Sequence, residues 1–270
     1  MHCGITGHTG VLGKYFINSS KKLKFNKYFG DINNKKKISK WILDNNFDCL
    51  FHFAALVPIK KVNSNYKLAR KTNYIAVKFI VDALKKKKKP IWFFFSSTSH
   101  VYGFSYKKFK ESNKTKPVNQ YGKLKLLAEK YIENNLKDSN IKFCIGRIFS
   151  YTHFTQSKDF FFPSILKKKM KKNCSFDKIN TLRDFVDLRD ICSAIRFLMK
   201  KKINGVFNIA SGKKVNLLNI YLMLNKNIRY NFKTTKPKNN ILANINKIKN
   251  MGWYPKYNIF DILENFKKKI

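Results

Sequence analysis

Tyr121 and Lys125 are the residues whose types and spacing most directly suggest chemistry. Side chains four residues apart lie on one face of a helix. An ammonium group near a phenol favours the phenolate, so Lys125 is expected to lower the pKa of Tyr121 from its usual value of about 10. The pair would then transfer protons at neutral pH. Because tyrosine and lysine are common in this chain, the interpretation depends on what surrounds the pair.

A hydroxyl-rich segment precedes this pair. Residues 91–95 are predicted to form a buried strand, and Ser96, Ser97, Thr98 and Ser99 follow it directly. Open α/β sheets bind their ligands at the carboxyl ends of their strands. The helix that carries Tyr121 comes next in the chain, so a strand end with hydroxyl groups is expected beside it.

A glycine-rich turn opens the chain. Gly7, Gly10 and Gly13 follow a short predicted strand, and residues 14–17 begin a helical pattern. Glycines at this spacing allow a tight turn, close approach of the backbone to a pyrophosphate, and close helix packing. The turn therefore predicts a dinucleotide site with its phosphates at the helix N-terminus.

The second predicted strand, near residues 23–26, ends without a carboxylate. Asn26 and Lys27 stand where an acid would bind the 2′-hydroxyl of an adenine ribose. A cation there suits a 2′-phosphate. The sequence therefore favours NADP, and NAD remains the alternative.

Buried strands alternate with amphipathic helices along the first part of the chain, which predicts an α/β fold with a Rossmann-type doubly wound parallel sheet and a small C-terminal α/β substrate lobe. Further apolar runs typical of buried strands lie at residues 48–55, 141–148 and 206–209. Helices are expected near residues 38–45, 66–84 and 259–268. Only short elements are expected at 160–172 and 183–191. We assign 1–150 to the NAD(P)-binding domain, with 183–212 returning to it, and 151–270 mainly to the substrate lobe.

The charge of the chain is strongly positive. It has 57 Lys+Arg against 15 Asp+Glu, a formal net charge of +42. Such a surface would attract nucleic acid or an anionic membrane. The excess is almost all lysine, however, and Lys, Asn, Ile, Phe and Tyr share A/T-rich codons. We therefore attribute the charge to codon bias, expect no nucleic-acid partner, and keep a non-catalytic, polyanion-binding protein as the alternative.

The sequence also predicts a cytoplasmic protein without a membrane partner. No apolar run approaches the roughly 20 residues that a membrane span needs, and the glycine turn begins too close to Met1 for a signal peptide. The cysteines lack metal-ligand spacing, so we expect buried thiols and neither disulfides nor a metal site. They are Cys3, Cys49, Cys144, Cys174 and Cys192.

A series of motifs in order along the chain resembles the extended short-chain dehydrogenase/reductase superfamily, in particular its nucleotide-sugar epimerase, dehydratase and reductase branch. The motifs lie at residues 6–13, 30–32, 52–55, 73, 96–103, 121–125, 147–149, 183–186, 205–212 and 252–255. Together they cover nearly the whole chain, and the order is far more specific than any single motif.

The resemblance implies roles for the matching residues. Tyr121 would exchange a proton with a sugar oxygen, Lys125 would bind the nicotinamide ribose, and Thr98 would hydrogen-bond the reacting oxygen. A nucleotide-activated sugar would contact Thr98, Ser150 and Arg183, and a homodimer is expected. The residues implied in binding NAD or NADP are Gly7, Thr9, Gly10, Val11, Leu12, Gly13, Asp31, Ile32, Phe53, Ala54, Ala55, Asn73, Ser96, Ser97, Tyr121, Lys125 and Phe149.

Departures from the family pattern narrow the reaction. Nucleotide-sugar 4,6-dehydratases usually carry an Asp-Glu pair after the catalytic Thr, whereas this chain has Ser99 and His100. Dehydration is therefore disfavoured, which leaves epimerisation and 4-keto reduction as equal candidates. Ser150 replaces an Asn that helps many members to hold the substrate diphosphate.

Two of these residues have open roles. His100 is either an additional acid/base or a structural hydrogen-bonding residue. Arg183 either grips a substrate phosphate or pairs with Asp184 or Asp187.

Overall fold

The structure is a computed structural model that describes residues 1–157, 159–163, 180–224 and 236–267. Cys174, the lysine run at 167–172 and most of the element expected at 160–172 lie outside the described residues. The other four cysteines are buried free thiols. None of the described helices is long and apolar enough to cross a membrane.

A six-stranded parallel sheet in the order β2-β1-β3-β4-β5-β7 forms the centre of the molecule. Its strands are β1 (His2–Thr6), β2 (Lys24–Lys27), β3 (Cys49–His52), β4 (Trp92–Thr98), β5 (Lys142–Ile148) and β7 (Gly205–Ile209). The central strands are almost continuously apolar because helices cover both of their faces. The predicted Rossmann-type sheet is confirmed, and the aromatic run of β4 belongs to its core.

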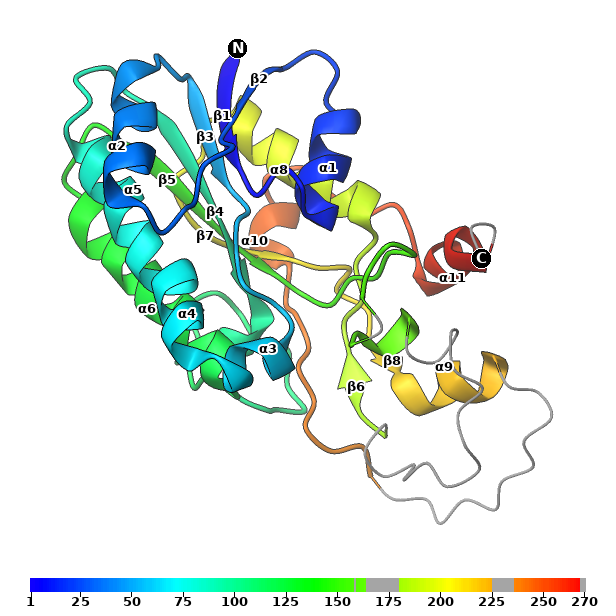
Figure 1. The fold of residues 1–270 in the computed structure, drawn as a ribbon. Helices are drawn as coiled ribbons and strands as arrows, with labels where there is room; N and C mark the ends of the chain where they lie inside the picture. Colours follow the sequence, from blue (N-terminus) through cyan, green and yellow to red (C-terminus); the bar gives the residue numbers. More distant parts are fainter. Residues whose placement is uncertain (158, 164–179, 225–235, 268–270) are drawn as a thin grey trace.

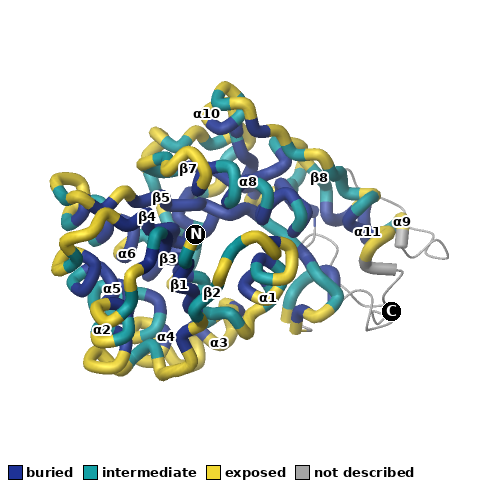
Figure 2. The backbone as a smooth tube through the Cα atoms, turned by 90° about the horizontal axis from the view of Figure 1, so that it is seen from above, coloured by how far each residue is buried: buried dark blue, intermediate teal, exposed yellow. Residues whose placement is uncertain are grey.

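Helices cover both faces of the sheet (Figure 1). On one face lie α1 (Val11–Asn18) and α8 (Leu188–Lys200). On the other lie α2 (Lys35–Asp44), α5 (Ala76–Lys85) and α6 (Gln120–Leu136). Figure 2 shows the buried strands enclosed by helices whose outer sides are exposed.

The spacing of apolar residues explains how the helices pack. In α5, Val77, Ile80, Val81 and Leu84 follow the helical repeat and are fully buried. The helix predicted at 66–84 is divided, with α4 (Tyr66–Arg70) and a π-helical turn (Lys71–Ile75) before α5, and α3 (Ile59–Ser64) precedes them. Asn73 lies in that turn.

Beyond the carboxyl ends of the strands, a smaller group of elements continues the chain (Figure 1). It contains the antiparallel pair β6 (Leu182–Arg183) and β8 (Val215–Asn216), with α9 (Leu217–Leu224) and α11 (Ile259–Lys267). Phe162, Phe185, Leu217, Ile220 and Ile262 form its apolar cluster. The short α10 (Asn246–Lys249) contacts β7 instead. The prediction of only short elements at 183–191 was wrong, because the 13-residue α8 begins there.

Candidate functional site

A cavity of about 380 Å³ lies at the carboxyl ends of the central strands. The glycine turn, the end of β4, the start of α6 and the segment after β5 all contribute to its wall. The predicted residues that line it are Gly7, Gly10, Val11, Leu12, Gly13, Phe53, Ala55, Ser96, Ser97, Thr98, Tyr121, Phe149 and Ser150. Residues predicted from separate motifs therefore meet at one site, although their roles stay predictions.

Other predicted residues do not line this cavity. They are Thr9, Asp31, Ile32, Ala54, Asn73, Lys125 and Arg183. The Asn73 side chain bonds to both polar groups of the Leu56 backbone, accepting from its N–H at 2.7 Å and donating to its carbonyl at 3.0 Å. Asn73 therefore holds the loop after β3 in place. Asp31 accepts a hydrogen bond from the Asn33 backbone N–H at 2.9 Å.

The glycine turn has the shape that a diphosphate group requires. Gly7 has a φ of +73°, and an added Cβ would lie 2.4 Å from the Ala54 nitrogen, so the fold itself demands glycine there. At Gly10 an added Cβ would meet nothing closer than Gly7 O at 3.4 Å, and the residue lines the cavity. Gly10 is also the N-cap of α1, which has no side-chain cap and no acid in its first turn. The open helix N-terminus fits a dinucleotide diphosphate.

The start of α6 is pressed against the turn that follows Thr98. Asn119 caps the helix by accepting a hydrogen bond from the Gly122 backbone N–H at 2.8 Å. A Cβ on Gly122 would lie 2.2 Å from the His100 carbonyl oxygen, so only glycine allows this contact. The contact fixes Tyr121, the residue before Gly122, beside the end of β4.

The Thr98 hydroxyl is oriented by the same turn. Its oxygen accepts a hydrogen bond from the His100 backbone N–H at 3.2 Å, and the residue is 8% exposed. Because that bond uses a lone pair of the oxygen, the hydroxyl proton remains to be donated. Thr98 can thus donate to an oxygen in the cavity.

The expected effect of Lys125 on Tyr121 was wrong. Burial raises the pKa of the Tyr121 phenol above its ordinary value, with Tyr151 adding in the same direction. Lys125 is 1% exposed, and its Nζ lies 4.1 Å from the centroid of the Phe95 ring. Burial lowers the pKa of Lys125 to about 7, against the opposing charge of Glu129. Desolvation is the largest cause of both shifts, so Tyr121 is a protonated phenol at neutral pH.

A buried ion pair supports the base of the site. Arg147 donates to Glu129 through Nη2 at 2.7 Å and through Nε at 3.1 Å. The Ser97 hydroxyl also donates to Glu129, and Arg147 Nη1 donates to the Tyr102 hydroxyl at 2.9 Å. Glu129 lies one helical turn after Lys125, so the pair ties α6 to the ends of β4 and β5.

Arg183 is not paired with either aspartate, so that alternative was wrong. Its Nη1 donates to the carbonyls of Leu182 at 3.0 Å and Asn239 at 2.5 Å. Asp184 accepts from the Ser211 and Gly212 backbone, and Asp187 pairs with Arg189 at 2.8 Å. Burial lowers the pKa of Arg183 to about 10. Within the described residues, Arg183 has no carboxylate partner.

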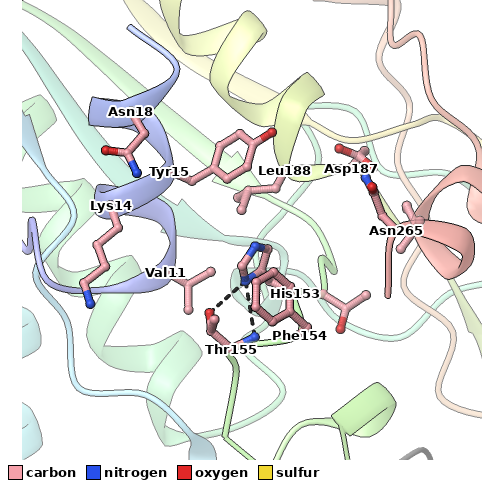
Figure 3. A pocket seen from close by; sticks show the side chains of 12 residues that line it. Val11, Lys14, Tyr15, Asn18, His153, Phe154, Thr155, Asp187, Leu188 and Asn265 are labelled. Carbon is pink, nitrogen blue, oxygen red and sulfur yellow. Dashed lines mark hydrogen bonds between the residues drawn. The ribbon is translucent and has the colours of Figure 1, made fainter. Parts of the chain in front are cut away.

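Figure 3 shows a second cavity, of about 480 Å³, lined by residues of α1 and of the segment after β5. It shares Val11 and Thr152 with the first cavity. Two of its polar side chains are already engaged: His153 bonds to Thr155 at 2.7 Å, and Asp187 caps α8. The glycine turn and the hydroxyls of Thr98 and Tyr121 face the smaller cavity. We therefore assign the candidate active site to the smaller one.

The sequence pattern described as GDP-mannose 4,6 dehydratase matches residues 5–266. The chain belongs to this family. The match confirms the resemblance to the extended short-chain dehydrogenase/reductase superfamily inferred from the motifs.

Relatives in this nucleotide-sugar epimerase/dehydratase family catalyse different reactions. The chain is 26% identical over 224 residues to UDP-glucose 4-epimerase of Mycoplasma genitalium, covering 73% of this chain and 66% of that protein. It is 26% identical over 233 residues to GDP-6-deoxy-D-talose 4-dehydrogenase of Aggregatibacter actinomycetemcomitans, covering 82% and 78%. The dTDP-glucose 4,6-dehydratase of Bacillus anthracis, solved with NAD, superposes with a TM-score of 0.84 at 19% identity over 100% of this chain and 97% of that one. Other solved family structures contain NAD or NADPH.

Some residues at the site were not predicted. Lys60, Gln156 and Asp159 line the cavity from short or irregular segments, where no periodic pattern marks them. Asn119 could have been found, because a polar residue just before a predicted helix is a typical N-cap signal. Its second contact, with His100, depends on the fold.

Proposed function

We propose that this family member is an NAD(P)-dependent enzyme that acts at C4 of a nucleotide-activated sugar, as a 4-epimerase or a 4-ketoreductase. One observation carries the proposal: the hydroxyls of Thr98 and Tyr121 line the same cavity as the glycine turn, with Lys125 buried one helical turn away. When bound, the nicotinamide would supply or accept the hydride. The protein must then move a proton at the oxygen of the same carbon.

Each residue has a distinct role in this proposal. Tyr121, a protonated phenol, donates its proton to a sugar carbonyl oxygen during reduction. The phenolate that this step leaves takes a hydroxyl proton in the opposite direction, when the sugar is oxidised. Thr98 donates a hydrogen bond to that oxygen. Lys125 holds the nicotinamide ribose, and Arg183 with Ser150 meets the substrate diphosphate.

The lining of the cavity supports chemistry at a single carbon. Elimination of water also needs a group that removes a proton from a neighbouring carbon, and Ser99 and His100 stand where dehydratases of this kind carry carboxylates. Asp159 is the carboxylate among the described lining residues, and it accepts a hydrogen bond from Ser157 at 2.8 Å in a different segment. Two relatives are named for reactions at position 4 of the sugar, one as an epimerase and one as a dehydrogenase.

The choice of cofactor depends on the end of β2. Asn26 is occupied, because it accepts from Trp41 Nε1 at 3.0 Å and donates to Asn45 at 2.8 Å. Lys27 is exposed and is the cation available to a 2′-phosphate there. We therefore propose that NADP binds at least as well as NAD, which parallel titrations of the two dinucleotides test. If Lys27→Gln lost affinity for NAD and NADP equally, Lys27 would have no specific role at the 2′-phosphate.

The decisive experiment replaces Tyr121 by Phe. Turnover of UDP-glucose and UDP-galactose with NAD, and of GDP-4-keto-6-deoxymannose with NADPH, is measured in both proteins. We expect a loss of about 10²- to 10⁴-fold in kcat, the usual contribution of a positioned acid/base. Dinucleotide affinity should change little. Tyr254→Phe is the matched control, because Tyr254 is 60% exposed. Full activity in Tyr121→Phe would remove Tyr121 from the mechanism.

Three broader expectations stay predictions beside this proposal. Sedimentation tests the homodimer, and fractionation of cells tests the cytoplasmic location. The polyanion-binding alternative requires nucleic-acid affinity that falls steeply with salt and is unaffected by Tyr121→Phe.

A further inference from the structure

His100 lies in the site but has no role in the function proposed above. Its ring lines the cavity and meets the Tyr121 ring edge-on, with centroids 6.1 Å apart and an angle of 86°. It belongs to the short 3-10 turn Ser99–Val101 that follows Thr98. The ring is therefore beside the two hydroxyls that would contact the reacting oxygen.

The hydrogen bonds of Asn119 determine which nitrogen of His100 carries the proton. The Gly122 backbone N–H can only donate, so the amide oxygen of Asn119 must face it, at 2.8 Å. The amide NH₂ of Asn119 then faces His100 Nδ1 at 3.0 Å. An amide NH₂ can only donate, so Nδ1 accepts and the ring proton is on Nε2.

The remaining nitrogen is open to the cavity. Among the described residues, none forms a hydrogen bond with His100 Nε2. This nitrogen is also not fully buried. It therefore reaches open space, and the open space along this ring is the cavity. An Nε2–H in this position is a hydrogen-bond donor without a protein acceptor.

The ring is also held neutral. Burial lowers the pKa of His100 to about 4, and the nearby Arg183 guanidinium acts in the same direction. Protonation at Nδ1 would set its N–H against the NH₂ of Asn119. A neutral ring whose Nδ1 is occupied and whose Nε2 carries a proton has no lone pair with which to accept another.

We propose that His100 is a specificity-determining residue that donates a hydrogen bond from Nε2 to a sugar oxygen next to the reacting carbon, and that it is not an acid/base. The inference deepens the proposed function and rests on it. A sugar hydroxyl or carbonyl oxygen supplies the acceptor. Since His100 cannot remove a proton from carbon in this state, it selects how the sugar lies against Tyr121 and takes no part in elimination.

Two substitutions separate the nitrogens. His100→Asn retains a polar group near Nδ1 but has none at the Nε2 position, whereas His100→Gln can present an amide N–H there. With the nucleotide sugars named above, we expect kcat/KM to fall about 10-fold or more in His100→Asn, because a substrate oxygen loses its donor. His100→Gln should recover most of that loss. Dinucleotide affinity and the pH dependence of kcat should be unchanged in both.

Equal activity in both variants and the unaltered protein would overturn the proposal. Loss of a pKa from the pH profile of kcat in either variant would also overturn it, because His100 would then be an acid/base. A measurement without turnover keeps the proposal distinguishable from the proposed function. Nitrogen NMR of histidine-labelled protein, with the resonance assigned by its absence in His100→Asn, should show a neutral Nε2–H ring down to about pH 5. A ring that titrates near its usual value of about 6.5, or one protonated on Nδ1, contradicts the assignment.

Discussion

Replacing Lys125 by Met should stabilise the protein at pH 6 while abolishing its activity. Lys125 is 1% exposed, and burial lowers its pKa from 10.5 to about 7. Met fills a similar volume and carries no charge. Glu129, the carboxylate nearest to Lys125 in the helix, keeps its bond to Arg147 at 2.7 Å, so the substitution leaves no unpaired carboxylate.

The magnitude follows from the difference between the folded and unfolded pKa values. Between about pH 7 and pH 10.5 the unfolded chain binds more protons at Lys125 than the folded one, so stability rises with pH through that window. At about 1.4 kcal/mol per unit, the ionisation of Lys125 costs the fold at most about 5 kcal/mol at pH 6 and about 2 kcal/mol at pH 9. The gain in free energy of unfolding from Lys125→Met should therefore be smaller at pH 9 than at pH 6, by about 2 to 3 kcal/mol.

Urea denaturation of the dinucleotide-free protein at pH 6 and pH 9 measures this difference. Lys123→Met is the matched control, since Lys123 is exposed on the same helix. It should change the free energy of unfolding by less than about 0.5 kcal/mol at both pH values. The reasoning fails if Lys125→Met is less stable than the unaltered protein at pH 6, or if the difference in free energy of unfolding is the same at pH 9. Either result would show that the buried ammonium does not destabilise the fold.

Two further substitutions test how the site is supported. Glu129→Gln leaves the Arg147 guanidinium without its buried carboxylate, which should lower the free energy of unfolding by about 3 to 5 kcal/mol in urea denaturation. A change below about 1 kcal/mol would contradict this prediction. Asp138→Asn, at an exposed position, is the control. Gly122→Ala places a Cβ 2.2 Å from the His100 carbonyl and must push α6 away from Thr98, so kcat should fall at least about 10-fold. Gly103→Ala, whose Cβ would meet nothing closer than 3.5 Å, is its control, and equal activity of the two variants would show that the contact is not needed.

The sheet and the place of the site could be predicted because local patterns determine them. Continuous apolar runs indicate strands that are covered on both faces. The glycine spacing indicates the phosphate-binding turn between the first strand and the first helix. The carboxyl ends of parallel strands lie at one edge of a sheet, so Thr98, Phe149 and the glycine turn had to meet. Gly4, unusual for a buried strand, is also explained: an added Cβ would lie 2.8 Å from both Leu50 and Phe47.

The electrostatics could not be predicted, because burial has no short-range pattern. The spacing of Tyr121 and Lys125 gives their mutual attraction but not the loss of water around each, and the loss of water decides both pKa shifts. The partners of Arg183 are equally non-local, since Asp184 is taken by residues 211 and 212. The start of α8 could have been found from local signals, because Asp187 is an N-cap residue and Leu188, Ile191, Ile195 and Leu198 follow the helical repeat on its buried face.

The charges in the site and near it correspond to the two halves of a nucleotide sugar. His100 and Tyr121 are both kept uncharged at neutral pH by burial, so with Thr98 they offer N–H and O–H donors to a neutral sugar oxygen. Arg183 keeps its charge, because even with burial its pKa stays near 10, and it has no carboxylate partner in the described part of the chain. A diphosphate is the group that such a cation would bind. Uncharged donors beside the glycine turn, and a guanidinium that lacks a carboxylate partner among the described residues, suit the proposed substrate: a sugar held by hydrogen bonds and bound through its phosphates.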